Sequence, residues 1–417
     1  MPKNERTFPY VPNFIGNGEM LGVYLASIVR TFAISLTGIF VPIYVSKLYS
    51  HLPLNEAVVR VVLYFILMEV ASLLMAVPAG KIILRLGFRY SIFIGNVLLA
   101  LANGSLILAQ NNHGWLVAAA ICEGVSLHFF WNCYHLTFAK QADKHHLGRQ
   151  ISLDGIFGTL VSAIAPAFGG MIATLFGFTA LLILSLSLII ISSFPLALVV
   201  DGKGYHLGDY CEIVKGYFSR KFRGFMWGFF FEGARGYVAW IAWPLFLLAV
   251  VKGSYDYLGF IVSATLIVSV IFCFFSGKLV DHGNETGGFT LGALFISFFW
   301  ILRIPITNPG QVFLVQSGGN MSESLYRVSW AATVYRRISG ITNSYLYVVL
   351  REIALRLGSL WGLLIAYTVS RAGFPLQTTF VFAALLPICT LSSLTVFDKP
   401  RSFVGRLIDR FTAREEL

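Results

Sequence analysis

AGKIILRLGFR, residues 79–89, and SGKLVDHG, residues 276–283, each stand at the end of a long apolar run. Each contains Gly-Lys followed by two branched aliphatic residues. Because the two stretches lie about half a chain apart, they predict that the sequence contains two similar halves.

The composition is typical of a membrane protein. Of the 417 residues, 57% are hydrophobic and 12% are charged, and the mean hydropathy is +0.74. A soluble domain averages about 25% charged residues. Apolar stretches of about 20 residues recur, which is enough for a helix to cross a bilayer. Alternating barrel strands are not seen, so we predict an all-α polytopic membrane protein.

We predict twelve transmembrane helices in two bundles of six. The expected domains are an N-terminal bundle (1–200), a cytoplasmic linker (201–222), a C-terminal bundle (223–397) and a cytoplasmic tail (398–417). The expected spans are 19–46, 57–80, 91–110, 114–138, 151–174, 178–200, 224–251, 254–280, 289–307, 311–334, 343–369 and 376–397.

The basic residues predict the orientation. Most of the 31 Lys and Arg residues fall on the side that holds both chain ends and the linker. The other side has only Lys47, Arg60, Lys252 and Arg371. The positive-inside rule therefore predicts cytoplasmic termini in a plasma (inner) membrane. The net charge of +11 is then explained by the basic residues on the cytoplasmic side of the membrane, and no nucleic-acid partner is expected.

The linker and the tail both carry apolar residues at helical spacing beside Lys and Arg, which predicts an amphipathic helix on the inner leaflet in each. The first residues are polar and aromatic, so no cleavable signal is expected. The five cysteines form no framework and are expected to be free thiols.

With these motifs the chain resembles the major facilitator superfamily, bacterial type. The family has a loop signature after its second and eighth helices, where charged contacts hold the cytoplasmic gate. The first copy is matched by Gly80, Ile82, Arg85, Gly87 and Arg89, and the second by Gly277, Leu279 and Asp281. Leu84 stands where the family has Asp. The first gate is therefore expected to lack one charged contact or to take it from elsewhere.

Residues 165–170 read APAFGG and are similar to the fifth-helix signature of exporters and antiporters in the family. Pro166 loosens the helix, and Gly169 and Gly170 permit a neighbour to approach closely. The resemblance also implies that the first and fourth helices of each half line a central cavity, that the second and fifth flank it, and that the third and sixth face lipid.

Charged residues inside a membrane are costly, by about 2.5–3.5 kcal/mol each on insertion scales, so each needs a reason. Those in the predicted spans, with neighbouring His, Asn and Trp residues, form the candidate cavity site. Its members are Arg30, Glu69, Glu123, His128, Trp131, Asn132, His135, Glu232, Arg235, Asn320, Glu323, Arg327, Trp330, Arg351, Glu352 and Arg356.

Two arrangements of these charges are open. Spacing of three or four residues suits same-helix ion pairs for Glu232/Arg235, Glu323/Arg327 and Glu352/Arg356. Arg30, Glu69 and Glu123 have no such neighbour, so we predict an inter-helix cluster with Arg30 near Glu123 or Glu69. Arg303 falls near the outer end of the ninth span, where its side chain could reach the membrane surface.

His128 and His135 lie seven residues apart on one helical face and are candidates for a proton-sensitive role. A zinc site would need two more converging ligands, so no metal and no cofactor are expected. Tryptophans are candidates for stacking on a substrate, with packing as the alternative.

The predicted function is secondary active transport of a small organic solute by alternating access between the two bundles. No nucleotide-binding P-loop is present, so coupling to an ion gradient, most simply of protons, is expected. Glu123, Glu323 or Glu69 is predicted to carry the proton. Arg30, Arg235 or Arg327 is predicted to contact the substrate or the gate.

The fifth-helix signature and the aromatic content favour efflux slightly. The alternatives are a sugar-like or organic-anion importer, and a receptor or scaffold without transport on the same fold. A membrane enzyme is not expected, because only DKHHLGR, 143–149, could supply a catalytic cluster. The expected partners are a small-molecule substrate, protons or another coupling ion, and the lipid bilayer, with the chain acting as a monomer.

Overall fold

The computed structural model describes residues 18–141, 147–195, 210–219, 222–281, 285–338 and 344–397, and nearly all of them are helical. The first half contains α1 (Gly18–Gly38), α2 (Phe40–Leu48), α3 (Leu54–Leu86), α4 (Phe88–Leu108), α5 (Trp115–Gln141), α6 (Leu147–Leu175) and α7 (Gly177–Ile191). After α8 (Tyr210–Phe218), the second half contains α9 (Arg223–Tyr237), η3 (Val238–Ala242), α10 (Trp243–Val250), α11 (Tyr255–Asp281), α12 (Glu285–Leu302), α13 (Pro309–Ile338), α14 (Ser344–Arg371) and α15 (Thr378–Phe397).

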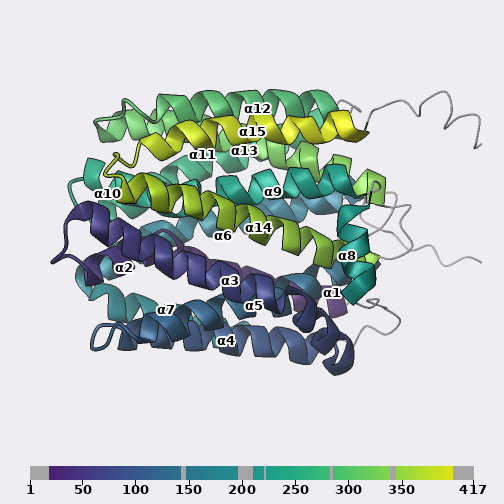
Figure 1. The fold of residues 1–417 in the computed structure, drawn as a ribbon, viewed down its shortest axis with the longest axis horizontal. Helices are drawn as coiled ribbons and strands as arrows, with labels where there is room; N and C mark the ends of the chain where they lie inside the picture. Colours follow the sequence, from purple (N-terminus) through teal and green to yellow (C-terminus); the bar gives the residue numbers. More distant parts are fainter. Residues whose placement is uncertain are drawn as a thin grey trace, which may run out of the picture.

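The predicted all-α polytopic fold is confirmed, and the helices follow the order of the predicted spans (Figure 1). The α1–α2 pair corresponds to the first span, and α9, η3 and α10 correspond to the seventh. By length and hydropathy alone, six described helices could cross a membrane, or seven if α1–α2 counts as one span. Neither α13 nor α14 is among the six. These two helices carry several of the charged residues that the sequence analysis assigns to the candidate cavity site.

The first helix of each half is interrupted near a proline. Pro42 has no N–H to donate to the carbonyl of Gly38, and the chain bends by 40° between α1 and α2. In the second half, the π-helical segment η3 ends two residues before Pro244, which denies the carbonyl of Trp240 its α-helical donor. Both halves therefore have a break in their first helix, near a proline.

The sixth span is shorter than predicted. We expected it to run over 178–200, but α7 ends at Ile191. Ser192 follows the helix, and its hydroxyl donates to the carbonyl oxygen of Ile189 at 2.6 Å. Such side-chain bonds compete with the helical backbone pattern, and Pro195 lies a few residues on. Hydropathy alone does not show this early end.

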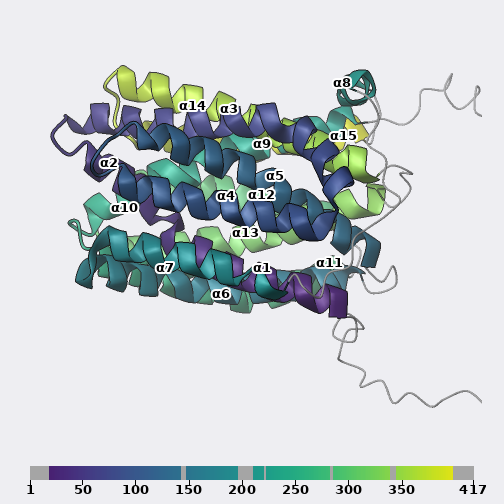
Figure 2. The ribbon, with the colours of Figure 1, turned by 90° about the horizontal axis from the view of Figure 1, so that it is seen from below.

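Each half packs on itself, and among the described residues two helix pairs make the most extensive contacts between the halves. Within the first half α5 packs on α3 and α4, and α6 packs on α1; within the second, α14 packs on α9 and α13 packs on α11 and α12. Between the halves, α6 packs on α11 and α3 packs on α14. The α3–α14 pair runs the length of the molecule, from the end near α2 and α10 to the end near α8 (Figures 1 and 2). We call these the far end and the linker end.

Glycines set the closest helix contacts. A Cβ at Gly124 of α5 would clash with the Met68 carbonyl of α3, and one at Gly358 of α14 would clash with the Phe230 carbonyl of α9. Between the halves, a Cβ at Gly259 of α11 would clash with the Pro166 carbonyl of α6. Backbones that approach this closely need small residues at the contact.

The helix α8 occupies part of the predicted linker. Ile213 is buried, and Gly216 lies against Leu346 and Leu350 of α14. Lys215 and Phe218 are exposed. The rest of the linker and the tail, with their expected amphipathic pattern, lie outside the described residues. Cys122, Cys133 and Cys389 are not in disulfides, while Cys211 and Cys273 belong to the part whose side chains are not described.

Candidate functional site

The polar residues of the described spans gather in three clusters. The α9–α13 cluster contains Glu232, Arg235, Glu323 and Tyr326. The α3–α14 cluster contains Glu69, Arg351, Glu352 and Arg356, with Tyr64, Ser72, Glu123, His128 and Asn132 beside them. The Arg30 cluster contains Arg30, Asn96, Phe130, Ser192 and Ser193.

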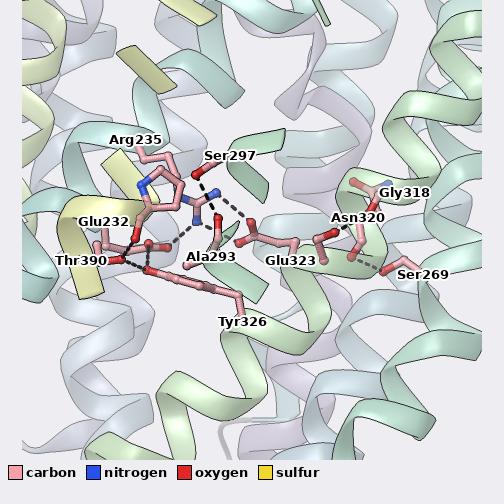
Figure 3. Close-up of polar contacts among 12 residues, drawn as sticks. Glu232, Arg235, Ser269, Ala293, Ser297, Gly318, Asn320, Glu323, Tyr326 and Thr390 are labelled. Atoms are coloured by element: carbon pink, nitrogen blue, oxygen red, sulfur yellow. Dashed lines mark hydrogen bonds and ion pairs between the residues drawn. The ribbon is translucent and has the colours of Figure 1, made fainter. Parts of the chain in front are cut away.

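Arg235 is the centre of the α9–α13 cluster (Figure 3). Its Nη1 and Nη2 donate to the two carboxylate oxygens of Glu323 at 2.7 and 2.9 Å, and Nη2 also donates to Glu232 Oε1 at 2.7 Å. Two-point pairing of this kind fits the planar guanidinium and adds directional specificity. The predicted Glu232/Arg235 same-helix pair is therefore present, and Glu323 joins it from α13.

Further hydroxyl groups hold this cluster in place (Figure 3). The Tyr326 hydroxyl donates to Glu232 Oε2 at 3.0 Å and lies 3.1 Å from Thr390 Oγ1 of α15. Along α13, Asn320 donates to Thr265 Oγ1 of α11 at 3.3 Å, and Ser324 and Ser269 share a 3.0 Å hydrogen bond. The predicted polar face of the tenth span thus contacts both α9 and α11.

Glu323 and Arg327 do not form the same-helix ion pair that their spacing allows. Glu323 turns to Arg235 of another helix, where it gains two hydrogen bonds to one guanidinium. Arg327 is exposed and makes no ion pair with any residue in the described part of the chain. Sequence spacing could not show this, because the better partner is 88 residues away.

Arg303 is buried, contrary to the expectation that its side chain reaches the membrane surface. Its guanidinium lies over the rings of Trp300 and Trp243, 3.8 and 4.3 Å from their centroids. Cation–π contact of this kind is stronger when water is excluded. The rings of Trp300 and Trp243 give Arg303 a favourable contact inside the protein, which a hydropathy profile does not reveal.

The α3–α14 cluster joins the two halves. Arg356 Nη1 donates to both carboxylate oxygens of Glu69 at 3.1 and 3.2 Å, and Nη2 donates to Glu352 at 3.1 Å. Arg351 lies 3.4 Å from the other oxygen of Glu352. The predicted Glu352/Arg356 same-helix pair is therefore present, and it extends across to Glu69 of α3.

Glu123 makes a different contact. The Tyr64 hydroxyl of α3 donates to Glu123 Oε2 at 2.6 Å, and Glu123 makes no ion pair with any described residue. The carboxyl of Glu123 also interacts electrostatically with that of Glu69, which carries the same charge. Glu123 is thus held by a neutral donor beside an ion-paired carboxylate.

His128 and Asn132 lie one turn apart on α5 and are fully buried. His128 Nε2 lies 2.8 Å from the Ser72 carbonyl oxygen and 2.9 Å from its hydroxyl. The carbonyl can only accept, so Nε2 carries the proton and Nδ1 is free to accept. Nδ1 of His128 and both amide atoms of Asn132 have no hydrogen-bond partner among the described residues. His135 lies in α5, but its side chain is not among those described.

Arg30 is 1% exposed, but its predicted cluster with Glu123 or Glu69 is wrong. Its Nε donates to Asn96 Oδ1 at 3.0 Å, and its guanidinium lies 3.9 Å from the centroid of the Phe130 ring. Nη2 has no hydrogen-bond partner in the described part of the chain. Glu69 and Glu123 are occupied by Arg356 and Tyr64 instead.

The end of α7 explains part of this arrangement. Asn96 donates to the hydroxyls of Ser192 and Ser193 at 3.1 and 3.0 Å, directly after the last residue of α7. A helix C-terminus carries a partial negative charge that favours a nearby cation. Asn96 therefore links Arg30 to the end of α7, and no carboxylate takes part in this link.

The tryptophans of the candidate site belong mainly to the packing. Trp330 is buried against Phe289 and Phe229, with ring centroids 5.0 and 5.5 Å apart. Trp131 is half-buried and packs edge-on against Phe130 and Tyr134. Of Trp330 and Trp131, Trp131 is the one whose side chain is partly exposed and could contact a solute.

The gate motifs lie at the expected helix ends. Gly87 joins α3 to α4 with a positive φ of 85°, which favours glycine, and Arg85 and Arg89 beside it are exposed. The carbonyl oxygen of Gly80 accepts a 2.7 Å hydrogen bond from the Tyr345 hydroxyl of α14. A contact between the halves thus exists near Leu84 and needs no charge. The side chain of Asp281 and the surroundings of Gly277 are not described.

The fifth-helix motif lies where α6 meets two helices. A Cβ at Gly169 would clash with the Leu36 carbonyl of α1, and one at Gly170 would clash with the Tyr255 carbonyl of α11. Pro166 lies inside α6, and its carbonyl faces Gly259. These contacts bring α6 against both its own half and the other half near the far end.

Sequence reasoning missed Tyr64, Tyr326 and Asn96 as members of the clusters. The two tyrosines resemble ordinary apolar residues in a hydropathy profile. Asn96 lies in the third span, which was expected to face lipid. A buried polar residue in any span deserves the same attention as a charge, because it must be hydrogen-bonded.

Comparisons with known proteins agree with this architecture. The sequence model described as the Major Facilitator Superfamily matches residues 23–207. No curated protein sequence matches the chain. Among solved structures, the chain is similar to a variant of the E. coli fucose:proton symporter FucP, at 12% identity and a TM-score of 0.65, over 92% of this chain and 100% of that one. At this identity the likeness shows the fold.

Proposed function

We propose that the chain is a secondary transporter of the major facilitator superfamily, coupled to protons, in which Glu123 carries the proton. Its substrate is proposed to be a small organic solute, moved by alternating access between the two halves.

One observation supports this choice of proton carrier. Glu69, Glu232, Glu323 and Glu352 each pair with an arginine at 3.1 Å or less. Glu123 accepts a hydrogen bond from a neutral tyrosine instead. A carboxylate that an arginine neutralises gains little from a proton, whereas one without a cation is relieved of its charge by protonation. Glu123 therefore suits the role better than Glu69 or Glu323.

The position of Glu123 also supports coupling to movement. It interacts electrostatically with Glu69, and Glu69 holds Arg356 of the opposite half. A proton that binds to Glu123 removes a negative charge beside this inter-half pair. Loading and release of the proton would thus change the electrostatic balance where the halves meet.

The proposal is tested in liposomes that contain a pH-sensitive dye, with a panel of organic solutes. We expect at least one solute to evoke proton movement in the wild type. Glu123→Gln should abolish that movement while the solute still stabilises the protein against thermal unfolding. Asp256→Asn is the matched control, because Asp256 is an exposed carboxylate bonded to Ser254. Unchanged proton movement in Glu123→Gln would remove Glu123 from the role.

The direction of transport is proposed to be export, which the fifth-helix motif supports. Gly169 and Gly170 hold α6 against α1 and α11, as a motif that governs closure of the two halves would require. Vesicles of both orientations distinguish the directions. Solute accumulation driven by an outward-directed proton gradient in right-side-out vesicles fits exchange of solute for protons, whereas accumulation driven by an inward-directed gradient would favour a symporting importer.

The cytoplasmic location of the linker end is also proposed. Lys81, Arg85, Arg89 and Lys215 lie at the described linker end, as the positive-inside rule requires. A reporter that fluoresces only in the cytoplasm, fused to either terminus, should be bright. A dark fusion would reverse the orientation.

A further inference from the structure

In the described part of the chain, polar contacts join α3 to α14 at three depths. At the far end, Arg371 Nη1 donates to Glu56 Oε1 at 2.8 Å. In the middle, Arg356 donates to Glu69 at 3.1 Å. At the linker end, the Tyr345 hydroxyl donates to the Gly80 carbonyl oxygen at 2.7 Å. Since α3 belongs to the first half and α14 to the second, each bond crosses from one half to the other. We call them the far, middle and inner rungs.

The rungs span the full length of the interface. With a rise of about 1.5 Å per residue, the middle rung lies about 20 Å from the far rung and about 17 Å from the inner rung. The total of about 36 Å exceeds the thickness of a hydrocarbon core, about 30 Å. The middle rung therefore lies close to the centre of the membrane, and the other two lie near its surfaces.

The rungs differ in burial. In the far rung, the side chains of Arg371 and Glu56 are 52% and 42% exposed. In the middle rung, those of Arg356 and Glu69 are 14% and 8% exposed. Exposed ion pairs contribute little to stability, whereas separating a buried pair leaves an uncompensated charge in a medium of low dielectric constant. The inner rung is a single neutral hydrogen bond. The end rungs can therefore break far more easily than the middle one.

Each partner of the middle rung is fixed to its own half. Met68, next to Glu69, is in backbone contact with Gly124 of α5. On the other side, Gly358 and Gly233 bring α14 and α9 into backbone contact around Leu355 and Phe230. Arg356 also remains bonded to Glu352 of its own helix. A movement of one half against the other therefore acts directly on the middle rung.

We propose that the Glu69–Arg356 pair is the pivot about which the two halves rock. The far rung breaks when the molecule opens at the far end, the inner rung breaks when it opens at the linker end, and the middle rung persists in both states. This inference rests on the proposed alternating access and adds the pair that anchors it. It does not depend on which residue carries the proton.

The test measures the opening of each end separately, by electron–electron distance measurements between spin labels in a background from which the native cysteines have been removed. Leu54→Cys with Phe374→Cys reports on the far end, and Leu86→Cys with Lys215→Cys reports on the linker end; these four positions are exposed. Each label pair is measured in the wild-type background, in Glu56→Gln, in Tyr345→Phe and in Glu69→Gln, with Asp256→Asn as the control.

We expect Glu56→Gln to increase the long-distance population at the far end only, and Tyr345→Phe to do so at the linker end only. Glu69→Gln should broaden the distributions at both ends together, because the common pivot is lost. If Glu69→Gln leaves both distributions at wild-type values, or changes one end alone, the pivot proposal is wrong. If Glu56→Gln opens both ends equally, the far and inner rungs do not break independently, and that part of the proposal is wrong.

Two variants guard against loss of folding. Glu69→Asp and Arg356→Lys keep the charges. The first shortens the acidic side chain, and the second replaces the guanidinium with a smaller ammonium group. Both should broaden the distance distributions at the two ends by less than Glu69→Gln does. The absence of this graded effect in protein that elutes as a single species would contradict the proposal. Proton movement in Glu123→Gln is measured independently, so a failure of the proton-carrier proposal leaves this result interpretable.

Discussion

Arg30 and Arg235 occupy matching places in the two halves, yet their surroundings differ. Each lies in the first helix of its half, before a break near a proline, Pro42 or Pro244. Arg235 is bonded to two carboxylates, Glu232 and Glu323. Arg30 is bonded to a neutral amide and stacked on a ring. The two halves share a scaffold and differ in how the same buried cation is stabilised.

The fourth helix of each half accounts for the difference. Glu323 lies fourteen residues after the first residue of α13, at the depth of Arg235. In α5 the residue at that distance from Trp115 is Phe129, and the next residue, Phe130, is the ring that covers Arg30. Glu123 lies about two turns nearer the far end, where it meets Tyr64 instead. A carboxylate in one half is thus replaced by an aromatic ring in the other.

The largest expected effect comes from removing the cation where it is paired. Arg235→Met leaves Glu232 and Glu323 close together without their common partner. Breaking a buried ion pair in this way costs about 3–5 kcal/mol. We expect the free energy of unfolding in mixed micelles, measured by SDS titration, to fall by that amount. A fall in the free energy of unfolding below about 1 kcal/mol would show that water already solvates these two carboxylates.

A second variant would convert the first half toward the second. Phe130→Glu places a carboxylate opposite Arg30 and should form a buried pair with it. In the Arg30→Met background, the same Phe130→Glu change buries a carboxylate without a cation. We expect Phe130→Glu to cost about 2 kcal/mol more in the Arg30→Met background than in the wild type, as coupled residues in contact do. Equal costs in both backgrounds would mean that the two side chains cannot meet.

Much of this fold could be predicted from the sequence. Apolar runs near 20 residues predicted the spans, and the side with more Lys and Arg predicted a common end for the linker and termini. Same-helix pairs such as Glu352/Arg356 follow from spacing. Pairs between distant helices do not, because Glu323 bonds to Arg235 of α9 instead of Arg327 of its own helix, and the placement of α9 near α13 cannot be read from spacing. The early end of α7 was also hidden, since it depends on how Ser192 bonds to the backbone.

A smaller effect is expected where the cation has no carboxylate. Arg30→Met loses one hydrogen bond to Asn96 and the contact with Phe130, but it also removes a buried charge. These effects oppose each other. We expect the free energy of unfolding to change by less than about 2 kcal/mol, measured as for Arg235→Met. A loss as large as that of Arg235→Met would show that the end of α7 neutralises Arg30 as fully as two carboxylates neutralise Arg235.

The two tyrosine–glutamate contacts allow the finest version of the comparison. Tyr64 donates to Glu123 at 2.6 Å in the first half, and Tyr326 donates to Glu232 at 3.0 Å in the second. Glu232 retains Arg235 when Tyr326 is replaced by Phe, whereas Glu123 loses its described hydrogen-bond donor when Tyr64 is replaced by Phe. A hydrogen bond to a charged group contributes about 1.5–3 kcal/mol, and an ordinary one about 1 kcal/mol. With Glu123 ionised, Tyr64→Phe should therefore be the more destabilising of the two. If both variants lose the same small amount, Glu123 is protonated in the resting protein, and its contact with Tyr64 is an ordinary neutral hydrogen bond.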